Sequence, residues 1–381
     1  MASTSCRRLA EELLERCLAG EPGEVDPRLT SECSAELFRV VAEGLADRFD
    51  PQLSDLYDRL FSRLLGVPPP VRVVPPVPFN VERVFVLSRV TLGADVAVTS
   101  TILDAAKRRF PEARILLAGS RKSWELFAAD SRVEHVEIDY PRVGTLAERL
   151  AVWPRLRKQL SVPASIVIDP DSRLTQLGLL PVCDPNRNFH FPSRSYGGDS
   201  DESLVTLTRR WVREVFGVDA SPYFAPMASS LSAKLTLSFG VGENPAKRIP
   251  DPFERELVRA LAARGFDILV DKGAGDEESE RVERAVAGVP RVRTWQGAFA
   301  PFAGAIARSR FYIGYDSAGQ HVAAACGVPL VSVFAGFPTL SMFHRWRPTG
   351  RGPIEVVRVD SPDPARALAA TMQALDRLGV S

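Results

Sequence analysis

The stretch FYIGYDSAGQHVAAACGVPLVSVF, residues 311–334, decides the fold class. Its apolar start, FYIG (311–314), is typical of a buried strand, SAGQHVAAAC (317–326) of a small-residue helix, and PLVSVF (329–334) of a second buried strand. A strand, a helix and a strand in this order indicate a parallel sheet. Ligands of such sheets bind beyond the carboxyl ends of the strands, so the turn at 314–321 is a candidate site.

The same alternation runs through the second part of the chain. The patterns predict strands at 234–240, 266–271 and 292–294, and helices at 276–287, 301–309 and 365–378. The tetrapeptide Asp-Pro-Phe-Glu at 251–254 predicts a helix start with Asp251 as the N-cap. Residues 229–381 are therefore expected to form one Rossmann-like domain.

An equivalent pattern precedes this domain. Strands are predicted at 83–88, 114–119, 133–138 and 165–170, and helices at about 96–109, 122–130, 145–160 and 201–216. A break is expected in the third of these helices at Trp153-Pro154, and residues 183–200 are expected to form a long loop. Residues 81–228 therefore predict a second Rossmann-like domain, and the fold class is α/β with two doubly wound parallel sheets.

Residues 1–80 have a different character. Leucines and valines recur at helical spacing up to residue 66, and no strand is evident. The stretch GVPPPVRVVPPVPF (66–79) is rich in proline and is interpreted as a stiff linker. The chain is thus expected to begin with a helical region that is joined by this linker to the two sheets.

Composition excludes several classes of protein. The 381 residues suffice for two domains with cores of their own, and a net charge of +1 argues against a nucleic-acid-binding protein. The five cysteines form no CxxC pair, so free thiols in a reducing compartment are expected. No signal peptide is apparent and no apolar run approaches about 18 residues. We therefore expect a cytoplasmic protein; peripheral contact with the inner face of a membrane and the oligomeric state are left open.

Carboxylates stand at several of the predicted strand ends. Asp95 follows the first strand of the first sheet and is either a general base or a helix N-cap. Asp169 and Asp171 have the DxD spacing of some metal-binding transferases, but a turn is the preferred reading. Glu278 or Glu280 could bind a ribose hydroxyl, although a solvated helix face is the simpler interpretation.

Cations and an exposed helix start point to an anion in the second domain. Lys247 and Arg248 follow its first predicted strand, where they would clamp a phosphate or lie in a solvated loop. Ser317 begins the small-residue helix, whose free N–H groups suit a phosphate. Asp316 and His321 flank that turn; His321 would contact the same anion or Asp316, or be an internally satisfied core residue.

The loop at 183–200 mixes cations with aromatic residues. Arg187, His190 and Arg194 could contact an anionic or sugar acceptor there. A plain surface loop is the competing interpretation.

Three motifs together resemble the heptosyltransferase family, glycosyltransferase family 9. YIGYDSAGQHVAAACGVPLVSVFAG (312–336) is similar to the family's strand, Asp-Ser/Thr-Gly-x-x-His turn, Ala-rich helix and Gly-x-Pro strand. FVLSRVTLGADVAVTSTILDAAKRRFPEARILLAG (85–119) resembles its opening strand, Gly-Asp turn and helix, and Lys-Arg-Ile-Pro (247–250) resembles its Lys-x-Trp-Pro. Compared with the family, Ala94 is inserted before the aspartate and Ala318 stands in place of glycine. Thr101 replaces the usual proline.

The resemblance implies a GT-B fold, two Rossmann-like domains facing across a cleft. It also implies an inverting, metal-independent transfer from a nucleotide-diphospho-sugar to a cell-envelope or surface glycan. Asp95 would be the general base. The diphosphate would be held by a set in which Lys247, Asp316, Ser317, Ala318, Gly319, His321 and Arg248 take part. No cofactor or metal is implied, because the nucleotide-sugar, ADP-linked or other, is a substrate.

Two other functions stay open on the sequence alone. The three departures from the family pattern would also suit a catalytically decayed protein that binds nucleotide-sugars or acts as a scaffold, with residues 1–66 serving to dock a partner. Another enzyme of GT-B fold, such as a sugar-nucleotide epimerase, would release an epimerised sugar without an acceptor.

Overall fold

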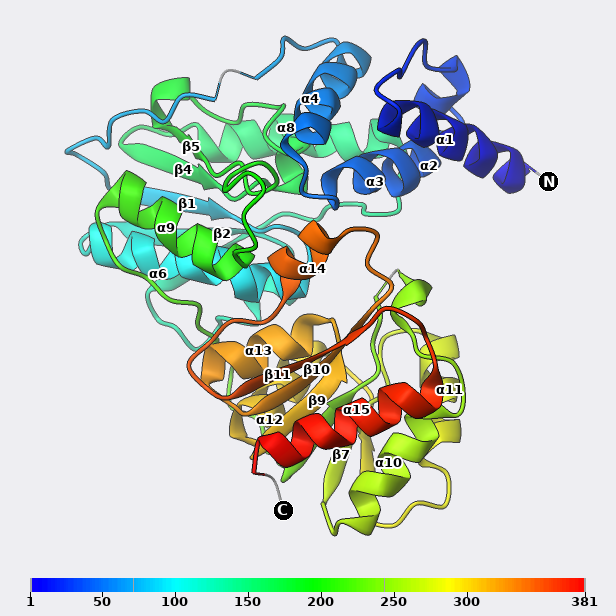
Figure 1. Cartoon of the computed structure of the whole chain (residues 1–381). Helices are drawn as coiled ribbons and strands as arrows, with labels where there is room; N and C mark the ends of the chain where they lie inside the picture. The colour runs from blue at the N-terminus through cyan, green and yellow to red at the C-terminus, as the bar shows by residue number, and fades with distance from the viewer. Residues whose placement is uncertain (1, 71, 243, 380–381) are drawn as a thin grey trace. The chain divides into compact units, whose positions relative to one another are not determined.

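The computed structural model describes residues 2–70, 72–242 and 244–379, which form two compact units (Figure 1). The first unit comprises Met1–Thr91, Ile102–Ser123 and Arg132–Ala220. The second comprises Leu92–Thr101, Trp124–Ser131 and Ser221–Ser381. The helical N-terminal region is thus grouped with the first sheet, and a short piece of the chain after the first strand is grouped with the second unit.

A parallel sheet in the order β3-β2-β1-β4-β5 forms the centre of the first unit. Its strands are β1 (Arg83–Leu87), β2 (Arg114–Gly119), β3 (Val133–Glu137), β4 (Ser165–Asp169) and β5 (Asn188–His190). Four of them confirm predicted strands. The prediction of a loop over 183–200 is wrong at β5, whose residues pair with 167–169 of β4. Only Phe189 of its three residues is apolar, so no alternation could reveal this strand.

Helices cover both faces of this sheet. Phe85, Leu87 and Val167 pack on one face with Leu156 and Leu160 of α8 (Leu146–Leu160). Val84 and Val86 of β1 are also buried and point to the opposite face. Helices α6 and α9 lie on that face in Figure 1. The other helices and 3-10 turns between and after these strands are α6 (Ser100–Arg109), α7 (Arg121–Trp124), η4 (Arg173–Thr175), η5 (Pro185–Arg187) and α9 (Leu204–Phe216).

Helix α8 runs through Pro154 without interruption, so the predicted break at this residue is wrong. The Thr145 hydroxyl accepts a hydrogen bond from the backbone N–H of Glu148, and the Glu148 carboxylate accepts one from the Thr145 N–H at 2.7 Å. This capping box and the buried side chains of Leu156 and Leu160 stabilise the helix. They outweigh the one backbone donor that proline lacks.

The N-terminal region is helical, as predicted, and shares a core with the first unit. Its elements are α1 (Ala2–Leu18), η1 (Pro27–Thr30), α2 (Ser34–Glu36), the π-helical η2 (Leu37–Ala42), α3 (Glu43–Ala46) and α4 (Pro51–Leu65). Asp50 caps α4 by accepting from Gln52 N at 2.8 Å. Leu60 of α4 packs in one cluster with Leu177 and Leu179, which follow β4. The region therefore covers apolar surface that the first unit would otherwise expose.

The prediction that all cysteines are free thiols is wrong for two of them. Cys6 of α1 and Cys33, just before α2, form a disulfide across a Cα–Cα distance of 5.1 Å. They are 27 residues apart, and only the packing of α1 against the following turns brings them together. Cys17, Cys183 and Cys326 are free.

A parallel sheet in the order β11-β10-β9-β6-β7-β8 forms the centre of the second unit. Its strands are β6 (Leu235–Ser238), β7 (Ile268–Asp271), β8 (Val292–Trp295), β9 (Phe311–Tyr315), β10 (Leu330–Ala335) and β11 (Ile354–Val359). All but β11 confirm predicted strands. The reversal of strand order between β9 and β6 places their carboxyl ends at the point where doubly wound sheets bind ligands.

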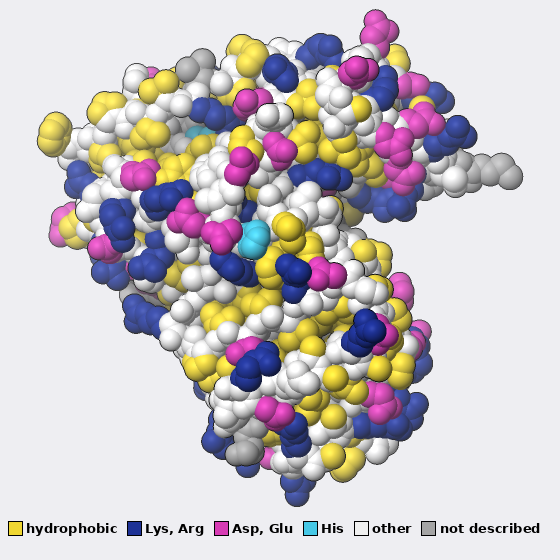
Figure 2. Space-filling view, in the orientation of Figure 1, with side chains coloured by type: hydrophobic (Ala, Val, Ile, Leu, Met, Phe, Trp, Pro, Cys, Tyr) yellow, Lys and Arg dark blue, Asp and Glu magenta, His cyan; other side chains and the backbone are white. Residues whose placement is uncertain are grey.

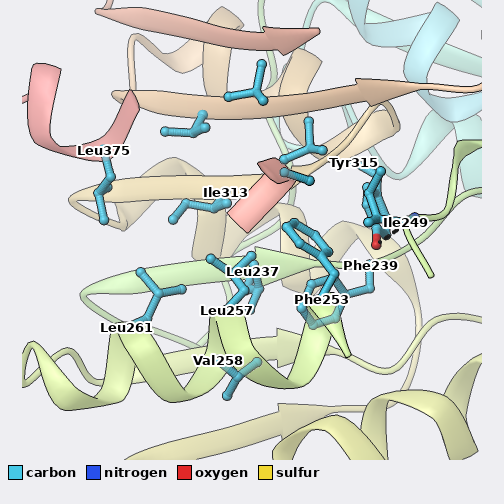
Figure 3. Close-up of a cluster of buried hydrophobic side chains, with 14 of the residues drawn as sticks. Leu237, Phe239, Ile249, Phe253, Leu257, Val258, Leu261, Ile313, Tyr315 and Leu375 are labelled. Atoms are coloured by element: carbon cyan, nitrogen blue, oxygen red, sulfur yellow. Dashed lines mark hydrogen bonds between the residues drawn. The ribbon is translucent and has the colours of Figure 1, made fainter. Parts of the chain in front are cut away.

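Leucine, isoleucine and phenylalanine side chains fill one face of this sheet, shown in Figure 3. Leu237 and Ile313 from the strands pack there with Leu257 of α10 and Leu375 of α15. Helices α12 and α13 pack on the other face, against β6, β9 and β10. The elements of the unit are α5 (Leu92–Ala94), η3 (Asp95–Thr99), η6 (Pro245–Lys247), α10 (Phe253–Ala263), α11 (Asp276–Val286), α12 (Phe299–Arg308), α13 (Ala318–Cys326), α14 (Leu340–Trp346) and α15 (Pro364–Arg377).

The predicted start of the first helix of this domain is wrong in its cap. Helix α10 begins at Phe253, its N-cap is Pro252, and no side chain caps it. The Asp251 carboxylate instead accepts a hydrogen bond from Arg248 at 2.6 Å. The Asp251 carboxylate therefore binds the Arg248 guanidinium and does not cap the helix.

Charged side chains of both signs are interspersed over the face shown in Figure 2, in line with the net charge of +1. Among the described residues, no helix is both long and apolar enough to cross a membrane.

Candidate functional site

The site is built from three loops at the carboxyl edge of the second sheet. β6, β9 and β10 are neighbours and parallel, so their carboxyl ends lie side by side. The loop after β6 carries Lys247, the turn after β9 carries Asp316 and Ser317, and the segment after β10 carries Gly336. The turns predicted from sequence at 247–248 and 314–321 therefore converge in one place.

Lys247 and Asp316 form a buried ion pair between two of these loops. The Lys247 ammonium donates to Asp316 Oδ2 at 2.6 Å and to the Asp316 backbone carbonyl at 3.2 Å. Only 16% of the lysine side chain and 4% of the aspartate side chain are exposed. A lysine ammonium has three donors, and these two bonds leave one unused among the described residues.

Gln320 connects Asp316 with the sheet and with the residues behind it. Its side chain is fully buried and donates to Asp316 Oδ1 at 2.5 Å and to the Trp346 carbonyl at 3.2 Å. Its carbonyl oxygen accepts from the Ser332 hydroxyl at 2.5 Å, on β10. Both oxygens of the Asp316 carboxylate are thereby engaged, which fixes the turn that precedes α13.

His321 is held in its neutral form. Burial lowers its pKa to about 4, an effect that Lys247 strengthens and Asp316 opposes. Its Nε2 lies 3.3 Å from Gln320 Nε2, whose two hydrogens are directed to Asp316 and to the Trp346 carbonyl, and its ring contacts Trp346 edge to face at 5.9 Å. The structure thus brings His321 beside the Asp316 network, in contact with Gln320 and Trp346.

The loop after β6 is fixed by a side-chain cap and by a close backbone contact. Asn244 Oδ1 accepts from Ala246 N at 3.0 Å, and its amide donates to the Gly336 carbonyl at 3.4 Å. A Cβ on Gly336, whose φ is +65°, would lie 2.3 Å from the carbonyl atoms of Ala246 and 2.6 Å from Lys247 N. Glycine at 336 therefore allows the approach that holds Lys247 beside Asp316.

The first turn of α13 offers backbone donors. Ser317 is the N-cap residue, but its side chain makes no capping hydrogen bond. The amides of Ala318 and Gly319 open a helix of nine residues, and the first N–H groups of a helix have no partner within it. These groups and the helix dipole favour an anion.

Arg248 does not join Lys247 in a shared clamp. It donates to Asp251 at 2.6 Å, and its Nε lies 3.4 Å from the buried carboxylate of Glu254. Arg281 pairs with the same carboxylate. Arg248 is the C-cap residue after the 3-10 turn that holds Lys247, and the two cations have separate partners.

The two glutamates that were candidates for ribose lie in different surroundings. Glu278 folds back over Gly273, where a Cβ would lie 2.0 Å from its carboxyl group, and burial raises its pKa. Asp271, at the end of β7, has a pKa raised by burial to about 6, and Glu278 adds to this effect. Glu280 is exposed and lies 3.8 Å from Arg284. Glu278 and Asp271, but not Glu280, therefore lie at the carboxyl edge of this sheet.

Asp95 belongs by its contacts to the second unit and begins the π-helical turn η3. It is fully buried, and its Oδ1 accepts a hydrogen bond from Thr99 at 2.8 Å. Both α5 and η3 pack against α13. At Gly93 a Cβ would lie 3.3 Å from the Cα of Ala318. The structure thus places the element that carries Asp95 beside α13, whose first turn is the candidate anion site.

The π-helical turn η3 begins directly after Ala94, the residue that the resemblance treats as inserted. A π turn takes up one residue more than an α turn, and such turns are frequent at functional sites. η3 follows Ala94 directly, so the chain regains α-helical geometry at Ser100.

Asp169 and Asp171 have structural partners, as the turn interpretation predicts. Asp169 accepts from Ser172 N at 2.7 Å and from the Thr175 hydroxyl at 2.6 Å. Asp171 pairs with Arg194 at 2.7 Å. Within the described residues, no group of three or more His, Cys, Asp and Glu side chains is placed to hold a metal ion.

The structure brings together two of the three residues predicted to contact an acceptor. His190 and Arg194 both lie at Asp171, with His190 Nε2 at 3.8 Å from its Oδ1. Arg72 contacts His190 and pairs with Asp58 of α4 at 2.7 Å. Burial alone would raise the pKa of Asp171, but the neighbouring cations outweigh it and hold this pKa below its usual range.

Arg187 lies apart from this cluster. It donates to the carbonyl of Ser165, the first residue of β4, at 3.0 Å. Since ligands bind at the carboxyl ends of these strands, Arg187 is turned toward the other edge of the sheet.

Sequence reasoning missed Gln320, Asn244 and Gly336. Gln320 stands inside the quoted motif, and a glutamine in a predicted helix of small apolar residues was the available signal. Nothing local marks Asn244 and Gly336, because their role depends on a contact between loops 92 residues apart.

Residues 230–352 match the sequence profile of glycosyltransferase family 9 (heptosyltransferase), which confirms the resemblance. The match spans β6 to β10 and includes Lys247, Asp316 and His321; it does not reach Asp95. No curated protein sequence matches the chain.

Solved structures confirm the expected fold of two Rossmann-like domains. E. coli heptosyltransferase WaaC with ADP is 17% identical, with a TM-score of 0.58 over 78% of this chain and 99% of that chain. A family 9 glycosyl transferase from Veillonella parvula is 16% identical, with a TM-score of 0.58 over 80% and 98%. E. coli ADP-heptose lps heptosyltransferase II is 17% identical, with a TM-score of 0.52 over 77% and 99%.

The lowered pKa of His321 predicts a pH dependence of stability. The folded protein binds this proton less tightly than the unfolded chain, whose histidine titrates near 6.5. The contribution is therefore fully present above about pH 6.5 and is lost as the pH falls toward 4. In urea unfolding of the wild type and of His321→Gln, the wild type should lose more stability between pH 7 and 4.5. Parallel pH profiles for the two proteins would contradict this account.

Proposed function

Residues 230–352 belong to glycosyltransferase family 9, and from this premise we propose that the protein is an inverting, metal-independent glycosyltransferase. It moves a sugar, heptose or a similar one, from a nucleotide-diphospho-sugar to a glycan acceptor of the cell envelope or surface. The observation that carries the proposal is the convergence of Lys247 with the uncapped first turn of α13.

Departure of a nucleoside diphosphate leaves negative charge on its terminal phosphate, and the site offers donors for that charge. The third N–H of Lys247 and the amides of Ala318 and Gly319 can bind phosphate oxygens. The Ser317 hydroxyl supplies a further donor. These groups are fixed before the reaction by the contacts of Asp316 and Gly336, so little reorganisation is needed as the charge develops.

Asp95 is the proposed general base. It takes the proton of the acceptor hydroxyl, the hydroxyl oxygen bonds to the anomeric carbon, and the bond from that carbon to the diphosphate breaks. The nucleoside diphosphate leaves with the electron pair, and the configuration at the anomeric carbon is inverted in this single displacement. Its position in η3, which packs on α13, supports this role.

Metal independence is supported by the character of the donors. Many transferases neutralise a departing diphosphate with a divalent cation, which needs oxygen ligands around it. Here an ammonium group and a helix start take that place, and the two aspartates of the DxD segment are committed to Ser172, Thr175 and Arg194.

The nature of the acceptor, a glycan of the cell envelope or surface, is proposed from the resemblance to the family. His190 and Arg194 stand at the carboxyl edge of the first sheet, where a glycan would bind, and they are tied to Asp171. A cytoplasmic location, with contact to a membrane face if the acceptor is lipid-linked, follows from such a substrate.

A second candidate function is a nucleotide-sugar-binding protein without transfer. The full burial of Asp95 favours it, because a buried carboxylate does not reach an acceptor hydroxyl without a movement of the chain. Calorimetry with ADP, GDP, UDP and dTDP followed by product analysis separates the two: transfer of sugar identifies the enzyme, and binding without transfer identifies the second function.

Replacing Lys247 by Ala should lower the rate of sugar transfer by about 100-fold or more, because a donor to the leaving group is removed. Asp316→Asn breaks the same ion pair but keeps the cation, and should therefore reduce transfer less than Lys247→Ala. Lys234→Ala, at the opposite edge of the same sheet, is the matched control and should retain the wild-type rate. Equal rates for Lys247→Ala and the control would exclude Lys247 from the site.

Asp95→Asn should reduce kcat by about 10²- to 10⁴-fold while the affinity for the nucleoside diphosphate stays close to that of the wild type, because only the proton acceptor is lost. Asp104→Asn in α6, whose carboxylate pairs with exposed Arg108, is the control. Full transfer activity of Asp95→Asn would show that the base is another group.

Chelation of divalent metals with excess EDTA should leave the transfer rate unchanged, because the proposed donors to the diphosphate are protein groups. Activity is measured before and after chelation and after addition of Mg²⁺ or Mn²⁺. Loss of activity with EDTA and its recovery with either ion would contradict the metal-independent mechanism.

A further inference from the structure

Tyr312 lies on the opposite face of β9 from the core shown in Figure 3. Phe311, Ile313 and Tyr315 point into that core, with Ile313 and Tyr315 labelled in the figure. Successive side chains of a strand point to opposite faces, so Tyr312 and Gly314 face α13. The Tyr312 side chain is fully buried.

Two glycines leave the space that the Tyr312 ring occupies. A Cβ on Gly314, the next residue on the same face of the strand, would lie 2.4 Å from the Tyr312 hydroxyl. A Cβ on Gly319, in the first turn of α13, would lie 2.3 Å from the same hydroxyl. The ring therefore extends toward the carboxyl end of β9, and its hydroxyl reaches the underside of the anion-binding turn.

Three hydroxyl groups gather at this point. The Tyr312 hydroxyl lies near those of Ser317 and Ser238, both of which favour its ionised form. Ser238 ends β6 beside Gly314, and its Oγ accepts from Gly240 N at 3.4 Å. Burial outweighs both serines and raises the pKa of Tyr312, so the phenol stays protonated. It makes no hydrogen bond of regular geometry with any atom of the described residues.

A buried hydroxyl without a well-formed hydrogen bond is costly and calls for a physical reason. Nothing in the packing requires the oxygen, since phenylalanine would fill the same space. The group does lie against Gly319 in the first turn of α13 and near Ser317, whose own hydroxyl is not used to cap this helix. A donor placed behind another hydroxyl polarises it, which strengthens the hydrogen bond that the second hydroxyl donates.

We propose that Tyr312 is a positioning residue for the diphosphate: when a diphosphate binds, the Tyr312 hydroxyl donates to Ser317 Oγ, and the Ser317 hydroxyl hydrogen is directed to a phosphate oxygen. The inference rests on the proposed function, because it presumes a diphosphate at the first turn of α13. Tyr312 itself does not touch the ligand; it acts through Ser317. Gly314 and Gly319 are required to be glycine because this tyrosine lies against both.

The test uses the full-length protein and ADP as the probe, with affinity measured by calorimetry. Tyr312→Phe should weaken ADP binding about 3- to 10-fold, the range expected when one hydrogen bond is lost. Thr236→Val is the matched control, because Thr236 pairs with Tyr312 across β6 and β9 and is equally buried. Its hydroxyl lies 3.1 Å from that of Ser309, so it is directed away from α13, and this variant should bind ADP like the wild type.

A double-mutant cycle separates positioning from a general loss of structure. If Tyr312 acts through Ser317, the double variant Tyr312→Phe/Ser317→Ala should bind ADP no more weakly than Ser317→Ala alone. Additive losses, or equal losses in Tyr312→Phe and Thr236→Val, would overturn the inference.

Unchanged affinity of Tyr312→Phe would also overturn it, while binding of ADP by the wild type would still support the proposed function. If the wild type binds none of ADP, GDP, UDP and dTDP, the diphosphate site fails, and the role of Tyr312 fails with it.

Discussion

A buried ion pair between Lys247 and Asp316 is the contact on which the site depends. It links the loop after β6 to the turn after β9. Gln320 donates a hydrogen bond to Asp316, and Gly336 allows the close approach of the loop that carries Lys247. Loss of one partner of such a pair costs about 3–5 kcal/mol, because the other charge stays buried and unpaired. The pair is neutral as a whole, so an anion is attracted by the donors that remain, the third lysine N–H and the first turn of α13, rather than by net charge.

Most of the fold could be predicted because most of its strands, among them β1, β4, β6, β9 and β10, are buried on both faces and read as short apolar runs. Two strands, β5 and β11, were not predicted because neither has such a run. Phe189 is the only apolar residue of β5. In β11 charged residues, among them Arg358, interrupt the apolar ones, and the strand lies at an edge of its sheet. Pro154 breaks no helix because a capping box and two buried leucines stabilise α8. The Cys6–Cys33 disulfide depends on tertiary packing, which cysteine spacing alone does not report.

The place of the candidate site could also be predicted, since chemistry in doubly wound sheets gathers at strand ends. The hydrogen-bond and ion-pair partners of the side chains in this site could not be predicted. Lys247 and Arg248 are adjacent in sequence, but Lys247 ends a 3-10 turn and pairs with Asp316, whereas Arg248 follows that turn and pairs with Asp251. The position of Ala94 before Asp95 was visible, whereas the π-helical turn that follows it and packs against α13 could not be read from the local sequence.

The most direct test of the account is a crystal structure of the protein with ADP. The account predicts a terminal phosphate oxygen within hydrogen-bond distance, about 3 Å, of Lys247 Nζ and of a backbone amide in the first turn of α13. It also predicts that the Lys247–Asp316 pair persists in the complex. A nucleotide bound away from α13, or a diphosphate that meets neither group, would contradict it.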